Sequence, residues 1–152
     1  MTTKVFPGIP ESASDARHFT GEVLASMGCA NIDAAQMIVS ELVTNSVRHS
    51  LSARDGWIGV SVTAQAGDHA VIIVADDGPA DGKAPAVPAE CPPLGESGMG
   101  LWIVSRMSEF TVGAPGLCWA RLPWTAPVVP DPALAGDLAG DVFAIAGLGA
   151  TS

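Results

Sequence analysis

Hydrophobic residues recur every three or four positions through most of the first fifty residues, which is the period of an amphipathic helix. We predict a first helix that Ser12 caps and Gly28 ends, because Ser12 is followed three residues later by Asp15. A second helix is predicted from Asn31 to about His49. At about 100° per residue, its core-facing arc comprises Ile32, Ala35, Ile38, Val39, Leu42, Val43 and Ser46.

The pattern changes to a period of two after residue 56, which indicates β-strands. The first predicted strand is half-buried, and its inward residues are Ile58, Val60 and Val62. The next strand, from about His69 to Ala75, is apolar on both faces and is therefore expected to be central in its sheet. Residues 110–124 predict a closing hairpin around a Gly-Ala-Pro-Gly turn.

A proline-rich segment separates these strands. Residues 79–97 contain five prolines and have neither a helical nor a strand period. Long structureless loops within a compact domain are usually functional, so we interpret this segment as a lid over a binding site. A helix of about residues 98–108 is predicted to follow. Residues 125–152 are rich in Ala, Gly and Pro and are interpreted as a mostly mobile tail, although a helix over 132–147 also fits the composition.

Composition narrows the class of protein. The 152 residues fit one domain, and 48% hydrophobic with 15% charged residues indicates a folded chain. The net charge is -9 without a basic run, so nucleic acid is not an expected partner. No apolar run reaches the about 18 residues of a membrane span, and no export leader is evident. We expect a cytoplasmic protein with reduced, mostly structural thiols at Cys29, Cys91 and Cys118.

Three short motifs carry candidate chemistry, and the first is SELVTNSVRHS in the second helix. Glu41 and Asn45 are four residues apart and share one stripe at the border of the apolar arc. A carboxylate can accept a proton from a hydroxyl, and an amide oxygen is a suitable ligand for Mg²⁺. By itself, this motif is more typical of an ordinary polar helix surface.

The second and third motifs are VADDGP and GESGMGLWIV. Asp76 follows the central strand, and Gly78 lets the chain turn while the carboxylate points into a cavity. Gly98 and Gly100 precede a helix, and bare backbone N–H groups at a helix start bind anions without cationic side chains. Taken singly, VADDGP is more typical of an ordinary Asp-Gly turn, and G-x-G also fits a flexible glycine linker or a simple N-cap.

The order of the three motifs is more informative than any one of them. The chain has, in this order, a helix with E-x-x-x-N, a strand ending in D-x-G, a proline-rich lid and G-x-G before a helix. Over about residues 10–124 it resembles the Bergerat or GHKL domain. Gyrase, histidine kinases and related chaperones share this ATP-binding domain. The resemblance implies an α+β two-layer sandwich, with a mostly antiparallel mixed sheet covered on one face by helices. The ATP-binding domain would span residues 1–124, with its lid at 79–97 and a tail at 125–152.

Within this superfamily the sequence is most similar to small stand-alone anti-sigma-factor serine/threonine kinases. SELVTNSVRHS and ESGMGLWIVSRMSE match their first and last motifs. We expect no room for the extra domains of gyrase or histidine kinases in 152 residues. The resemblance implies ATP and Mg²⁺ as cofactors and a sigma factor or a STAS-domain antagonist as partner. It also allows a homodimer, and no membrane partner is expected.

The resemblance also assigns roles to residues. Glu41 would be the catalytic carboxylate, and Asn45 would bind Mg²⁺ together with the nucleotide. Asp76 would accept a hydrogen bond from the adenine amino group, with Gly78 giving clearance for the base. The predicted phosphate-facing hinge comprises Gly98, Met99, Gly100 and Leu101.

Three positions depart from the family pattern. Ala80 replaces a glycine, Glu96 stands where another glycine is common, and Met99 stands where close relatives often have a cation. These departures bear on phosphoryl transfer more than on nucleotide binding. They leave open a nucleotide-dependent binding module without kinase activity, and an ATPase that acts on small molecules. His49 is interpreted as a packing or supporting residue.

Overall fold

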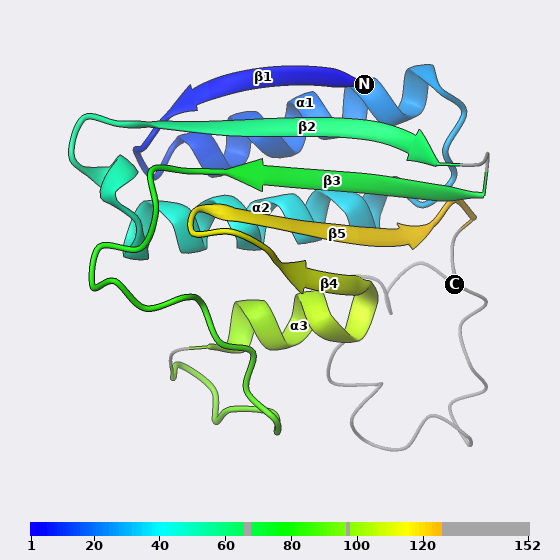
Figure 1. Ribbon diagram of the computed structural model, residues 1–152. Coiled ribbons are helices and arrows are strands. Elements are labelled where there is room, and N and C mark those ends of the chain that lie inside the picture. The colour runs from blue at the N-terminus through cyan, green and yellow to red at the C-terminus, as the bar shows by residue number, and fades with distance from the viewer. Residues whose placement is uncertain (66–67, 97, 126–152) are drawn as a thin grey trace.

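Five strands and three α-helices form a two-layer structure in the computed structural model, which describes residues 1–65, 68–96 and 98–125. The sheet has the order β1-β2-β3-β5-β4, and each neighbouring pair is antiparallel. Figure 1 shows the helices gathered on one face of the sheet. The α+β sandwich predicted from the sequence is confirmed. The elements are β1 (Thr2–Pro7), α1 (Ser12–Ser26), α2 (Ile32–His49), a 3-10 turn (Leu51–Ala53), β2 (Trp57–Gln65), β3 (His69–Ala75), α3 (Met99–Met107), β4 (Glu109–Val112) and β5 (Leu117–Pro123).

The strand β1 at the N-terminus was not predicted. It pairs with β2 at the edge of the sheet, and Phe6 is its one buried residue. An edge strand that buries a single side chain has no alternating pattern, which explains why the sequence did not reveal it. The Phe6 ring packs edge-on against Phe19 of α1, with centroids 6.0 Å apart, and this contact holds α1 beneath the strand.

The two long helices occupy their predicted ranges, but α1 starts differently from expectation. Ser12 is the first helical residue instead of the N-cap, and its hydroxyl donates a hydrogen bond to the Pro7 carbonyl. This bond ties the helix start to the end of β1. The α2 arc is buried as predicted, except that Ile32 is half-buried. At the start of α2, the Asn31 amide donates to the Pro123 carbonyl at 2.9 Å and links the helix to β5.

The hydrophobic core lies between the sheet and the helices. The alternating inward residues of the three central strands are Ile58, Val60, Val62, Ala70, Ile72, Val74, Ala120 and Leu122. They pack against the apolar arc of α2 and the inner face of α1. β3 is flanked by β2 and β5, which confirms its central position. Its two faces differ, because its inward residues are buried and Val71 and Ile73 are half-buried on the opposite face.

The expectations for the C-terminal tail and for membrane spans can be compared only with the described residues. All but the first residue of the predicted tail lies outside the described residues, so its state remains a prediction. Over the ranges that the structure does describe, no helix combines the length and apolarity needed to cross a bilayer.

The three cysteines are free thiols; Cys29 is buried, Cys118 is half-buried and Cys91 is exposed.

Candidate functional site

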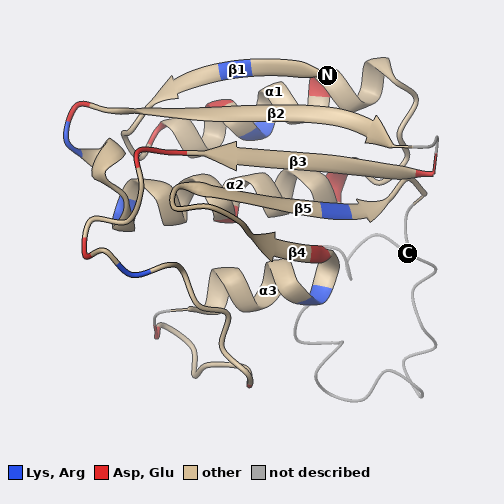
Figure 2. Ribbon diagram, viewed as in Figure 1, with Lys and Arg blue, Asp and Glu red and all other residues tan. Residues whose placement is uncertain are grey.

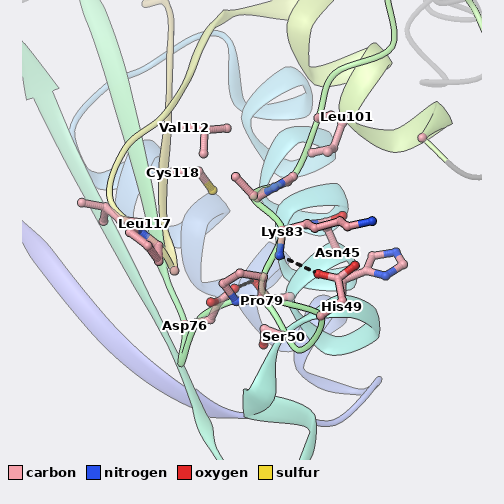
Figure 3. Close-up of a pocket in the computed structure, with 18 residues that line it drawn as sticks. Asn45, His49, Ser50, Asp76, Pro79, Lys83, Leu101, Val112, Leu117 and Cys118 are labelled. Carbon is pink, nitrogen blue, oxygen red and sulfur yellow. Dashed lines mark hydrogen bonds between the residues drawn. The ribbon is translucent and has the colours of Figure 1, made fainter.

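A pocket of about 300 Å³ opens where the end of β3, the C-terminal end of α2, the start of α3 and the β4–β5 turn meet the proline-rich loop. Four of the predicted site residues line it, namely Asn45, Asp76, Gly98 and Leu101. Figure 3 shows side chains from these separate elements around one cavity. Segments more than fifty residues apart in the sequence therefore build a single site.

Asp76 is fixed at one end of this pocket by hydrogen bonds. The Ser46 hydroxyl on α2 donates to Oδ2 at 2.7 Å, and the Gly78 N–H donates to Oδ1 at 2.8 Å. The Asp76 N–H in turn donates to the Gly116 carbonyl at 2.7 Å. Each carboxylate oxygen keeps a lone pair after these bonds, so Asp76 can still accept from an amino group in the pocket.

The neighbouring Asp77 has a different role. Its Oδ2 accepts from the Ser52 hydroxyl at 2.8 Å and from the Trp57 N–H at 3.3 Å. The Ser52 hydroxyl lies 2.9 Å from the Asp77 N–H, within hydrogen-bond distance. These contacts fasten the loop before β2 to the end of β3. Of the two adjacent aspartates, Asp76 therefore lines the pocket and Asp77 supports the fold.

Two glycines allow the backbone to close around Asp76. Gly78 has φ +91° and Gly116 has φ +82°, a region that other residues rarely adopt. A Cβ at Gly116 would also lie 3.0 Å from the Gly78 nitrogen, so a side chain there would push the turn away from Asp76. Both glycines are therefore required by the shape of this end of the pocket.

Apolar side chains form the walls beside Asp76. They come from α3, β4 and β5 and comprise Leu101, Val112, Leu117 and Cys118. Burial, with a smaller contribution from the charge of Asp76, raises the pKa of the Cys118 thiol to about 12. Cys118 therefore stays protonated at neutral pH and behaves as a small apolar wall residue. An apolar slot with one carboxylate at its end suits a flat heterocycle that carries an amino group.

The start of α3 faces the other part of the pocket. Gly98 is the N-cap, and its backbone has the left-handed conformation, with φ +97°. The helix begins at the next residue, Met99. The Trp102 N–H bonds the Gly98 carbonyl at 3.0 Å. The N–H groups of the first helical turn have no partner within their own helix and carry the positive end of its dipole. This end of the pocket therefore suits an anion.

Two residues of the predicted phosphate-facing hinge, Met99 and Gly100, face α2 instead of the pocket. Met99 packs with Met37 and Met107 against the buried Trp102 and Ile103 instead of lining the pocket. Its apolar side chain explains this position, since a methionine gains more from that cluster than from a solvated anion site.

Gly100 marks the closest approach of α3 to α2. A Cβ at this position would collide with the Glu41 carboxylate, so glycine at residue 100 makes room for that group. Glu41 is half-buried, and burial raises the pKa of its carboxyl, although the charge of Arg48 acts in the opposite direction. Glu41 is not among the residues that line the pocket but lies one helical turn before Asn45, which does.

The first residues of the proline-rich loop, 79–97, are held to the end of α2 by hydrogen bonds. The Leu51 N–H donates to the Gly78 carbonyl and the Ala80 N–H to the His49 carbonyl, each at 2.8 Å. Ala80 does not have a positive φ, so alanine fits where a glycine had been expected. The His49 side chain is exposed at the pocket rim, so it does not pack in the core, and its supporting role stays a prediction.

Comparison with known families agrees with this geometry. A sequence model of the histidine kinase-like ATPase domain matches residues 6–113, which is most of the chain. The chain belongs to this family. A comparison with curated protein sequences gives no match. Membership of the histidine kinase-like ATPase family implies that the domain binds ATP, and the pocket described above is the candidate site.

The residues of this ATPase domain fit ATP at both ends. Asp76 and the apolar walls provide an acceptor and a slot for adenine, while the start of α3 and Asn45 lie where an anionic chain can extend. Gly98 is needed for close approach as well, because a Cβ there would lie 2.8 Å from the Pro88 ring. The pocket therefore separates an amino-recognising end from an anion-binding end.

Sequence reasoning did not assign a site role to Ser46 or Gly116. Ser46 was placed in the apolar arc, where it is indeed buried, and Gly116 in a turn. The signal for Ser46 was its hydroxyl among apolar residues, directly after Asn45. A buried hydroxyl needs a partner, and the partner here is Asp76.

Replacing Ser46 with alanine is expected to weaken ATP binding about fivefold. Asp76 would lose the donor that orients Oδ2, and one such bond is worth about 1 kcal/mol. Titration calorimetry measures the dissociation constant, and Ser40→Ala is a matched control because the Ser40 hydroxyl bonds only the Gln36 carbonyl within α2. Equal ATP affinities of the two variants would contradict the assigned role of Ser46.

Proposed function

We propose that this ATPase domain is an anti-sigma factor with serine/threonine kinase activity, which phosphorylates a STAS-type antagonist in the cytoplasm. The observation that carries the proposal is the place of Glu41, beside the pocket and not inside it. A sigma factor is the second proposed partner, and a homodimer is compatible with the same role.

Glu41 has the surroundings of a general base. Its carboxyl is half-buried against Gly100, and its raised pKa makes the ionised form a better proton acceptor than an exposed glutamate. It lies one turn from Asn45, and we expect a hydroxyl presented at the rim to reach both Glu41 and the anion-binding end of the pocket. The carboxylate would take the hydroxyl proton while the hydroxyl oxygen bonds to the terminal phosphorus and ADP leaves.

Asn45 is the proposed ligand of Mg²⁺. Its side chain lines the pocket, and Figure 3 shows it beside His49. An amide oxygen is a hard ligand, and Mg²⁺ commonly takes only one or two protein ligands and completes its coordination with phosphate oxygens and water. Bound there, the ion would supply charge neutralisation for phosphoryl transfer.

The second candidate is a module that binds nucleotide and captures its partner without phosphorylating it. Met99 favours this function, because it packs into the α2–α3 cluster and leaves the start of α3 without a cation. Such a protein would use ATP to hold the proline-rich loop and α3 in a partner-binding arrangement.

Incubation with labelled ATP, a sigma factor and candidate STAS-domain proteins distinguishes the functions. The kinase predicts label on a serine or threonine of a STAS protein, with ADP formed in equal amount. Capture of either partner without label supports the binding module. Steady phosphate release in the absence of any partner indicates an ATPase that acts on small molecules and contradicts both.

A further inference from the structure

The pocket is poor in positive charge. Among the Lys and Arg residues of the described chain, only Lys83 lines it, and the carboxylates of Asp76 and Asp81 line it as well. Figure 2 shows acidic segments at the end of β3 and in the following loop, with a short basic segment in that same loop. A nucleotide would bring further negative charge to a chain whose net charge is -9. Its binding therefore depends on every positive group within reach.

Lys83 has a defined place in the loop. The loop start is held to the end of α2 by the Leu51 and Ala80 hydrogen bonds described above. The next turn is closed by the Gly82 N–H, which donates to the Pro79 carbonyl at 3.2 Å. The Asp81 carboxylate accepts from the Lys83 N–H at 2.9 Å. These bonds fix the Lys83 backbone relative to α2.

The same turn directs Lys83 to the anion-binding side of the pocket. Figure 3 shows Lys83 with Asn45 and His49 on one side of the pocket and Leu117 on the other. The Lys83 side chain is exposed, and none of the salt bridges within the described residues involves it. Its ammonium group is therefore free to bind a ligand, and a lysine is a point charge that suits phosphate oxygens.

We infer that Lys83 is the cation that contacts the phosphate chain of the bound nucleotide and sets the preference for ATP and ADP over adenosine. It supplies from the loop the charge that Met99 does not supply from the start of α3. The inference rests on the proposed function only for the presence of ATP in the pocket, and it requires no phosphoryl transfer. A charge-assisted contact of this kind is expected to strengthen binding about tenfold.

The test compares Lys83→Gln, Lys83→Arg and Lys4→Gln, each in the full chain. Lys4 is the only other lysine, and its ammonium group lies 5.5 Å from the Phe6 ring on β1, so both glutamine variants have the same net charge. Titration calorimetry measures the dissociation constants of adenosine, ADP and ATP. We expect Lys83→Gln to weaken ADP and ATP binding about tenfold without changing adenosine binding. Lys83→Arg should restore most of the difference, and Lys4→Gln should match the unmodified chain.

Two results would overturn the inference. If Lys83→Gln weakens ATP binding no more than Lys4→Gln does, Lys83 is not a phosphate contact, and the ATP site itself stands. If adenosine binding falls as much as ATP binding, Lys83 acts on the shape of the pocket instead. Failure of the unmodified chain to bind any of the three compounds is a separate outcome, which rejects the ATP site and the proposed function with it.

Discussion

Replacing Asp76 with asparagine should weaken ATP binding about 50-fold, or by about 2.3 kcal/mol. The carboxylate already accepts from the Ser46 hydroxyl and the Gly78 N–H and still has lone pairs for an adenine amino group. An asparagine keeps one acceptor oxygen and replaces the other with an NH₂ donor. Two donors would then face each other, and the charge that strengthens the bond would be lost.

The adjacent aspartate supplies the control for this experiment. Asp77→Asn removes the same charge one residue away, but Asp77 bonds Ser52 and Trp57 instead of lining the pocket. This variant should lose about 1 kcal/mol of unfolding free energy and bind ATP with nearly unchanged affinity. Calorimetric titration with thermal unfolding separates the two effects. Unchanged ATP affinity in Asp76→Asn would falsify the adenine assignment.

The sequence predicted most of the fold because the core-facing residues follow regular periods. The α2 arc and the inward residues of β2 repeat every 3.6 and every two positions, and the structure buries them accordingly. β1 escaped prediction because it buries only Phe6 and is held mainly by backbone bonds to β2. Backbone pairing leaves little trace in the order of side chains, so edge strands are poorly visible in sequence.

The sequence predicted only those site residues that belong to a short motif. Asn45, Asp76 and Gly98 were identified from short motifs, and the fold brings them around one pocket. The orientation of Met99 and the contact between Glu41 and Gly100 depend on how α3 packs on α2. Lys83 and Gly116 enter through turns whose direction is set by backbone hydrogen bonds. Such tertiary contacts have no local signature, and only the structure revealed them.

Glu41→Gln is expected to reduce phosphoryl transfer to the partner about 1000-fold if the protein is the proposed kinase. Glutamine keeps the shape of the side chain beside Gly100 but cannot accept the proton of the attacking hydroxyl. Because Glu41 does not line the pocket, ATP affinity should change by less than about twofold. Transfer of labelled phosphate and titration calorimetry measure the two quantities. Glu22→Gln on the exposed surface of α1 is the matched control, with transfer expected to be normal.

The pH dependence distinguishes a base from a merely structural group. Burial raises the pKa of Glu41, so the transfer rate should rise as the pH passes through that raised value, and Glu41→Gln should lack this rise.

The effect of pH on the stability of the fold has the opposite sign. A carboxyl with a raised folded-state pKa stabilises the fold most below its unfolded pKa, and this contribution is lost as the pH rises through the folded value. Glu41→Gln should therefore unfold at the same or a higher temperature at neutral pH. Lower transfer in a variant that is no less stable assigns the loss to chemistry, whereas unchanged transfer leaves the binding module as the function.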